Sequence, residues 1–172
     1  ISIDDAKNKS KSQMREIIAR RFRFVTVGHS FRVTEMEAAL ALAQLENWKD
    51  MIAKRRRNAK YLINNLSPLE PYMQLPSIRT GCDHSFMMFP IVLKNEKKER
   101  VVNELEARGI ETRDMLPLIN QPIYKKLFNL REKDYPIAEW INKSGFYIGC
   151  HQDLSASDLE YIVKTLRNLV PS

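Results

Sequence analysis

The sequence has few glycines, cysteines and histidines, and these shortages exclude several classes of enzyme. Among 172 residues there are 5 Gly, 2 Cys and 3 His. The chain has no GxGxxG dinucleotide fingerprint, no phosphate loop ending in GKS or GKT, no GxSxG nucleophile elbow and no HExxH zinc motif. With so few histidines, we expect no metal site.

The chain also lacks an apolar run long enough to cross a membrane. The longest run, from Phe86 to Leu93, is broken by Pro90, whereas a spanning helix needs about 20 apolar residues. The N-terminus has neither an initiator Met nor the pattern of a secretory signal, so we expect a trimmed chain or a fragment. Cys82 and Cys150 belong to no CxxC pair, and we expect two free thiols in a reducing cytoplasm.

Positive charge is in excess, with 28 Lys and Arg against 21 Asp and Glu, a formal net charge of +7. The densest basic run is KRRR at 54–57, followed by Lys60. Basic residues gathered on one face can contact the phosphates of nucleic acid, but no aromatic stacking motif accompanies this run. We therefore expect a solvated helix face and no nucleic-acid partner.

The strongest secondary-structure signal is a helix from Thr34 to about Leu66. Thr34 and Glu37 have the spacing of a capping box, in which each side chain accepts the other residue's backbone N–H. The first half of the helix is apolar around much of its circumference, at Met36, Ala39, Leu40, Leu42, Ala43, Leu45, Trp48 and Ile52. So broad an apolar surface can pack on two sides, which is typical of a helix at a domain or subunit junction.

Short strands and helices follow the long helix. We expect strands at 85–93, 110–113 and 146–150, and helices at 96–108, 121–128, 135–142 and from 155 to about 169. This order predicts an α+β fold, with a long N-terminal helix and a small sheet covered by helices. We divide the chain into a lead-in segment (1–33), a connecting helix (34–66) and a small α+β C-terminal domain (67–172).

A loop with the composition of an anion site precedes the long helix. Gly28, Ser30 and Arg32 combine flexibility, a hydroxyl and a positive charge just before the helix start. Helix N-termini bind anions readily. The alternative is that Ser30 and Arg32 only shape and cap the turn.

The same loop resembles a signature of a known family. Residues 28–35 (GHSFRVTE), with Ala38-Ala39 and Gln44-Leu45, are similar to the Gly-x-Asn-Tyr-Arg-x-Ser/Thr-Glu, Ala-Ala and Gln-Leu elements of the DegT/StrS-type nucleotide-sugar aminotransferases. Residues 109–124 resemble the family's substrate-proximal segment, and residues 148–155 with the final helix resemble its C-terminal strand and closing helix. The resemblance extends from about residue 14 to 170, and it matches only the C-terminal part of such an enzyme.

This resemblance implies a fold type I enzyme that uses pyridoxal 5'-phosphate (PLP). The family's Schiff-base lysine and the aspartate that pairs with the pyridine nitrogen lie in a large N-terminal domain, so no catalytic residue is assigned in this chain. Ser30 and Arg32 match residues that contact the cofactor phosphate across a homodimer, although Ser30 stands where the family usually has Asn.

The resemblance also implies a substrate site with contacts from Arg113, Asn120 and His151, while Ile119 stands where many members have His. The intact enzyme would transfer an amino group from glutamate to a nucleotide-linked keto sugar, for lipopolysaccharide, other cell-surface polysaccharides or antibiotics. One alternative is a dehydratase that uses pyridoxamine phosphate, in which His replaces the Schiff-base lysine. Another is a non-catalytic module that binds a partner through the apolar helix.

Overall fold

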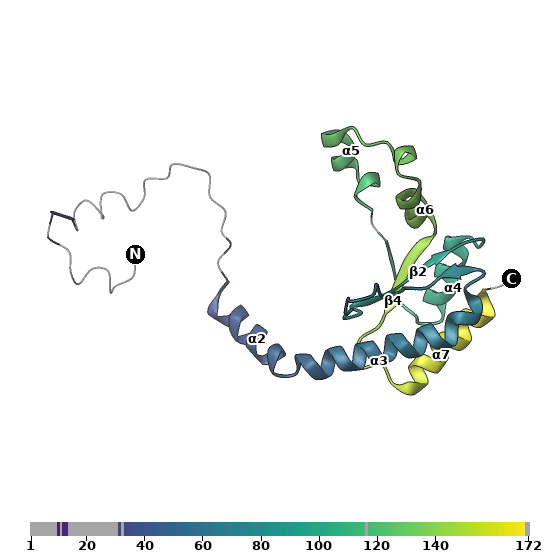
Figure 1. Ribbon diagram of the computed structural model, residues 1–172, viewed down its shortest axis with the longest axis horizontal. Coiled ribbons are helices and arrows are strands. Elements are labelled where there is room, and N and C mark those ends of the chain that lie inside the picture. The colour runs from purple at the N-terminus through teal and green to yellow at the C-terminus, as the bar shows by residue number, and fades with distance from the viewer. Residues whose placement is uncertain (1–9, 11, 14–30, 32, 116, 171–172) are drawn as a thin grey trace. The chain divides into compact units, whose positions relative to one another are not determined.

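The computed structural model describes residues 10, 12–13, 31, 33–115 and 117–170 (Figure 1). The chain divides into two units, Ile1–Leu42 and Ala43–Ser172. The candidate cofactor residues Ser30 and Arg32 lie outside the described residues, so their roles stay predictions. The domain boundaries at residues 33 and 66 also stay predictions. Within the described part of the chain, no helix is both long and apolar enough to cross a membrane.

Helix α2 (Glu35–Glu46) begins at the predicted capping box. The Glu37 N–H donates to Thr34 Oγ1 at 3.3 Å, and Glu37 Oε2 accepts from both the N–H and the hydroxyl of Thr34 at 2.8 Å. The Thr34 N–H, followed by its hydroxyl, lowers the pKa of the Glu37 carboxyl by stabilising its charged form. No residue of α2 is buried, and Met36 and Leu40 are 79% and 67% exposed. The described contacts that stabilise α2 are therefore local ones.

Helix α3 (Trp48–Leu66) starts after a break at Asn47, whose backbone leaves the helical region at φ −111° and ψ 10°. The prediction of one unbroken helix from 34 to 66 is therefore wrong at Asn47, although both ends are confirmed. Asn is only mildly unfavourable inside a helix, so it is a weak signal for a break. In contrast to α2, α3 has a buried face, on which Ala59, Leu62 and Leu66 are fully buried.

Four antiparallel strands form one sheet in the order β1-β2-β4-β3. They are β1 (Met73–Gln74), β2 (Met88–Leu93), β3 (Thr112–Asp114) and β4 (Gly145–Gly149). Three of these strands confirm the predictions. The strand β1 has no counterpart among them, because two residues are too few to form an alternating pattern. The mixed helix and sheet composition confirms the predicted α+β class.

One face of the sheet forms the hydrophobic core. Phe89 and Ile91 of β2 and Phe146 and Ile148 of β4 are at most 1% exposed. Helices α3, α4 (Lys98–Ala107) and α7 (Ala156–Leu169) add buried aliphatic side chains to the same core (Figure 1). The core therefore joins segments that are far apart in the sequence.

Local signals set the ends of the helices around this core. Ser155 and Asp158 form the predicted capping box at the start of α7. After α4, Gly109 adopts φ +77°, and the N–H groups of Gly109 and Ile110 donate to the carbonyls of Glu106 and Leu105. This pair of bonds is a Schellman motif, which needs a residue that tolerates positive φ. The predicted helix stop at Gly109 is confirmed.

Between β3 and β4 the chain forms a series of short helices, which we call the excursion. They are η3 (Leu118–Asn120), α5 (Pro122–Phe128), η4 (Glu132–Asp134) and α6 (Pro136–Ser144). Pro begins both α5 and α6, at a position where a helix does not need the missing N–H. The Trp140 indole N–H donates to the Leu93 carbonyl at 3.2 Å, which ties α6 to β2.

Candidate functional site

The face of the sheet opposite the core carries polar side chains near β3 and β4. Arg113 pairs with Tyr147, and Tyr147 pairs in turn with Pro90. Residues directly opposite each other in antiparallel strands project from the same face. Because Phe146 and Ile148 project into the core, Arg113 and Tyr147 stand side by side on the other face.

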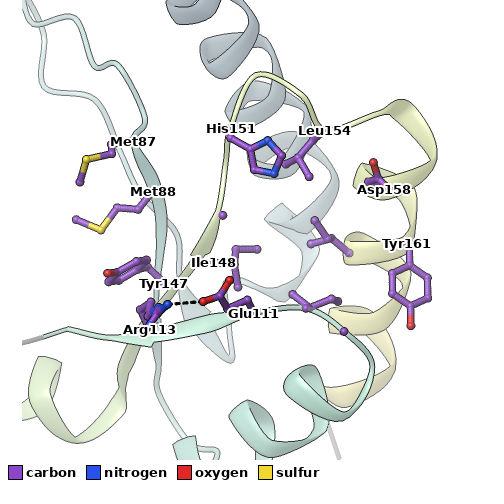
Figure 2. A pocket seen from close by; sticks show the side chains of 14 residues that line it. Met87, Met88, Glu111, Arg113, Tyr147, Ile148, His151, Leu154, Asp158 and Tyr161 are labelled. Carbon is purple, nitrogen blue, oxygen red and sulfur yellow. Dashed lines mark hydrogen bonds and ion pairs between the residues drawn. The ribbon is translucent and has the colours of Figure 1, made fainter. Parts of the chain in front are cut away.

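A cavity of about 650 Å³ opens beside this pair (Figure 2). Figure 2 shows Arg113 and Tyr147 on one side of it, His151 and Tyr161 on another, and Glu111 between them. The volume lies within the range typical of small-molecule sites, about 300–1,000 Å³. The structure therefore brings together two of the predicted substrate residues, Arg113 from β3 and His151 from the turn after β4.

Arg113 is paired with a carboxylate on its own segment. Its Nη2 atom lies 2.5 Å from Glu111 Oε1, and the two side chains are 66% and 71% exposed. An ion pair as exposed as this one is weak, typically below about 1 kcal/mol. The guanidinium is therefore available to an incoming anion that can compete with Glu111.

The backbone that carries Arg113 is fixed by Glu106 at the end of α4. Glu106 Oε1 accepts from both the N–H and the hydroxyl of Thr112 at 2.6 Å. The Thr112 hydroxyl and then its N–H lower the pKa of Glu106, and the nearby charge of Arg113 adds a smaller effect in the same direction. This carboxylate ties α4 to β3, and so it sets the position of Arg113.

The turn that carries His151 is fixed by α3. The buried Asn58 side chain donates to the His151 carbonyl at 2.8 Å, and Arg55 Nε donates to Gln152 Oε1 at 3.1 Å. The Asp153 N–H donates to His151 Nδ1 at 3.3 Å, so we assign the proton of the neutral ring to Nε2. The Nε2–H group is the hydrogen-bond donor that His151 can offer to a ligand.

Two further side chains near this turn are engaged in bonds within the protein. The Asp158 carboxylate lines the cavity, but it accepts from the N–H and hydroxyl of Ser155 at 2.9 and 2.6 Å. The Cys150 thiol lies 3.7 Å from the Arg55 carbonyl, and burial raises its pKa to about 11. Cys82, in contrast, is exposed, and both cysteines are free, as predicted.

Asn120 lies outside this cavity, in η3. Its Nδ2 donates to Asn142 Oδ1 at 2.6 Å, and its Oδ1 accepts from Gln121 Nε2 at 2.8 Å. Both bonds lie within the excursion, and they engage the Asn120 side-chain amide at its nitrogen and at its oxygen. The substrate contact assigned to Asn120 stays a prediction, and the geometry does not place it with Arg113 and His151.

Sequence reasoning missed the aromatic and sulfur-containing residues of the site, which include Tyr147, Tyr161 and Met88. Of these residues, only Tyr147 could have been predicted from a sequence pattern. It lies between Phe146 and Ile148, two core residues in the predicted strand, so alternation places it on the opposite face. Tyr161 donates its hydroxyl to the Arg108 carbonyl at 3.0 Å, a contact that no local pattern reveals.

The cavity can bind a polar anionic ligand, but it does not complete a PLP site. Arg113, Tyr147 and the His151 Nε2–H are donors for phosphate or hydroxyl oxygens, while Met88 and Leu154 offer apolar contacts. Among the residues that the structure describes, no lysine lines the cavity, so none of them could form a Schiff base there. The residues described also contain no group of three or more His, Cys, Asp or Glu that could hold a metal ion.

Two curated proteins are similar to this chain over most of its length. GDP-4-keto-6-deoxy-D-mannose 3-dehydratase of Escherichia coli O55:H7 is 28% identical over 168 residues, which are 92% of this chain and 41% of that protein. GDP-perosamine synthase of Caulobacter vibrioides is 29% identical over 151 residues, which are 86% of this chain and 40% of that protein. The chain spans about two fifths of the length of these relatives.

A solved structure and a family model agree with these similarities. A crystal structure of GDP-4-keto-6-deoxymannose-3-dehydratase with a trapped PLP-glutamate geminal diamine matches with a TM-score of 0.75 and 27% identity, over 92% of this chain and 41% of that one. The model of the DegT/DnrJ/EryC1/StrS aminotransferase family matches residues 3–167. The sequence resemblance and its fold are confirmed, and the chain belongs to the DegT/DnrJ/EryC1/StrS aminotransferase family.

Proposed function

We propose that this chain is the C-terminal domain of a PLP-dependent enzyme that transfers an amino group from glutamate to a nucleotide-linked keto sugar. One observation carries the proposal. Arg113 and His151, on two separate segments that resemble the family's signatures, line the same cavity. That arrangement suits a ligand with an anionic part and a hydroxyl-rich part.

In this proposal the side chains bind and orient the substrate. Arg113 binds a phosphate oxygen of the nucleotide, because a guanidinium can donate two parallel hydrogen bonds to phosphate. His151, through Nε2–H, and Tyr147, through its hydroxyl, bind sugar oxygens. Glu111 competes with the phosphate for Arg113. Asn120 is kept as a third substrate contact, although its amide must first leave its partners in the excursion.

The cofactor itself would supply the electron sink for the chemistry when it is bound. Since no lysine of the described residues lines the cavity, and the chain spans about two fifths of the length of its relatives, we assign the covalent attachment of the cofactor to a segment outside these 172 residues. Ser30 and Arg32 are proposed to contact the cofactor phosphate in a neighbouring subunit. We assign no chemical step to the side chains described above.

A homodimer and a cytoplasmic location belong to the same proposal. The exposed apolar side chains of α2, among them Met36, Leu40 and Leu45, support the dimer because such side chains are commonly covered in an assembly. The same surface also supports the alternative of a non-catalytic module that binds a partner protein. The two differ in whether the complete protein turns over a nucleotide sugar.

The second candidate function is the dehydratase that uses pyridoxamine phosphate. It is favoured by the relative named as a 3-dehydratase, whose identity of 28% is close to the 29% of the synthase. Identities this close do not separate the two reactions. The product of the complete enzyme, given glutamate and a GDP-linked 4-keto sugar, does separate them. An amino sugar formed in equal amount to 2-oxoglutarate supports the transferase, and a keto sugar that has lost a hydroxyl group relative to the substrate supports the dehydratase.

The binding part of the proposal has its own test on this chain. Calorimetry with GDP as the probe should give saturable binding that Arg113→Gln weakens about 10- to 100-fold, as expected for the loss of a charge-assisted hydrogen bond. Arg131→Gln is the matched control, because Arg131 is similarly exposed at 63% and is paired with Asp134. Equal GDP affinity in the two variants would exclude Arg113 as the phosphate contact.

A further inference from the structure

A second cavity, of about 260 Å³, lies between α3 and the loop that leads into β2. Arg56, Lys60 and Asn64 line it from α3. Because these residues are four apart, they share one face of the helix. The loop contributes Ile78, His84 and other residues described below. None of its lining residues lines the cavity that contains Arg113, so it is a separate site.

An arginine of α3 holds the loop in place. Arg56 Nε donates to the His84 carbonyl at 2.9 Å, and Arg56 Nη2 lies 3.6 Å from Asp83 Oδ2. The loop also contains a turn at Gly81, with φ +79°, in which the Cys82 N–H donates to the Arg79 carbonyl at 3.0 Å. The wall opposite α3 is therefore built by specific contacts.

Phe86 gives the cavity a buried aromatic wall at the expense of backbone strain. It adopts φ +49°, which is unfavourable for a bulky residue, and its side chain is buried. Its N–H donates to His84 Nδ1 at 2.9 Å, and the two rings lie 4.4 Å apart between centroids. Because Nδ1 accepts, the neutral His84 ring carries its proton on Nε2. Strained residues of this kind are concentrated at binding sites.

The opposite wall carries two exposed polar side chains, those of Lys60 and Asn64. The structure records no hydrogen bond or ion pair for the Lys60 ammonium or the Asn64 side-chain amide within the residues described. Arg56 and Lys60 contribute two positive charges, and Asp83 contributes one negative charge. The balance favours a ligand with a single negative charge.

We propose that this cavity binds a small aromatic carboxylate. The carboxylate would bind Lys60, with Asn64 and the His84 Nε2–H as further donors, and the ring would pack against Phe86 and Ile78. The cavity is smaller than typical drug-sized ligand sites, which begin at about 300 Å³, so a nucleotide sugar does not suit it. The proposal is independent of the function assigned to the Arg113 cavity.

The test is a titration of the 172-residue chain with benzoate, followed by amide chemical shifts in NMR spectra. Benzyl alcohol serves as the uncharged analogue. We expect saturable benzoate binding with a dissociation constant of about 1 mM, a normal value for a ligand of this size. The largest shifts should fall on residues 60, 64, 84 and 86. Benzyl alcohol should bind at least 10-fold more weakly.

Two substitutions separate this site from general charge effects. Lys60→Met should weaken benzoate binding about 10-fold and leave benzyl alcohol binding unchanged. Lys133→Met removes an exposed lysine of η4 far from the cavity in sequence, and it should change neither. Thermal melting confirms that both variants fold. The proposal is wrong if benzoate does not saturate below 10 mM, if both variants weaken it equally, or if the shifts fall on residues of the Arg113 cavity.

Discussion

Helix α2 and the second half of α3 are both helices, but they differ in what stabilises them. The described part of α2 has a capping box at Thr34 and exposes its leucines, including Leu40. The second half of α3 buries Ala59, Leu62 and Leu66 in the core of the sheet. This difference shows that a helical sequence pattern identifies a helix but does not identify the surface that packs against it. For α3, the residues that form that surface lie in β2, β4 and α7.

The largest effect that we expect is on the free energy of unfolding, and a matched pair of leucine substitutions tests the difference between the two helices directly. Leu62→Ala should destabilise the chain by about 2–5 kcal/mol, because it leaves a cavity in the core. Leu40→Ala should change the free energy of unfolding by less than about 0.5 kcal/mol, as expected for an exposed site. Urea denaturation measures both. Similar losses in the two variants would mean that α2 is buried in the folded chain as α3 is.

The next effect concerns the polar contact between α3 and the His151 turn. Asn58→Ala removes the buried amide that donates to the His151 carbonyl, and we expect a loss of about 1–3 kcal/mol in unfolding free energy. The variant should also bind GDP more weakly, since the turn positions His151. Asn65→Ala is the control, because the Asn65 side chain bonds within α3, to the Tyr61 carbonyl four residues earlier, and the variant keeps the Asn65 carbonyl that accepts from Arg167. GDP affinity unchanged in Asn58→Ala would remove His151 from the proposed site.

A smaller effect compares the two capping boxes. Ser155→Ala should cost about 1 kcal/mol of global stability, because α7 packs in the core. Thr34→Ala should lower the helical circular dichroism of α2 with little change in the unfolding midpoint. Equal shifts of the midpoint in the two variants would contradict the comparison.

The cap of α7 also predicts a pH dependence. Hydrogen bonds from the Ser155 hydroxyl and then its N–H hold the pKa of Asp158 below its ordinary value of 3.8. The stabilisation is therefore fully present above that value and is lost as pH falls through the lowered pKa of the folded state. Ser155→Ala should flatten the dependence of stability on pH below about 4. Urea midpoints measured from pH 2 to 7 check this.

The smallest effect concerns the exposed pair beside the larger cavity. Glu111→Gln removes the carboxylate that competes for Arg113, and GDP should bind about 2- to 5-fold more tightly, as expected for a pair worth below about 1 kcal/mol. Glu104→Gln breaks the comparable pair between α4 and Arg108, the residue that follows it, and should have no effect. Weaker GDP binding by Glu111→Gln would indicate that Glu111 contacts the ligand itself.

Local signals made much of the fold predictable. The boxes at Thr34 and Ser155 and the stop at Gly109 each depend on residues within a few positions of one another, and all three are confirmed. The pairing of Arg113 with Tyr147 depends on the register between two strands separated by the whole excursion. No local pattern sets that register, so the sequence could suggest Arg113 but not its neighbour.

The basic run of α3 shows the same limit. A solvated face was predicted for 54–57, and Arg56 and Arg57 are exposed, whereas Lys54 and Arg55 are partly buried. Arg55 bonds to Gln152, 97 residues away, and Arg56 bonds to the His84 carbonyl, 28 residues away. A long side chain at the surface can reach loops that the sequence gives no means of locating. The charge pattern identified the basic residues but not Gln152 and His84, to which two of them bond.

The contrast between the two cysteines provides a natural labelling site. Cys150 is buried with its pKa raised to about 11, and the thiolate is the form that reacts with electrophiles. Cys82 is exposed and lies next to Asp83 in the loop held by Arg56. In the folded chain a maleimide dye at neutral pH therefore attaches at one position, without any mutation. Its fluorescence would report movements of that loop as they occur.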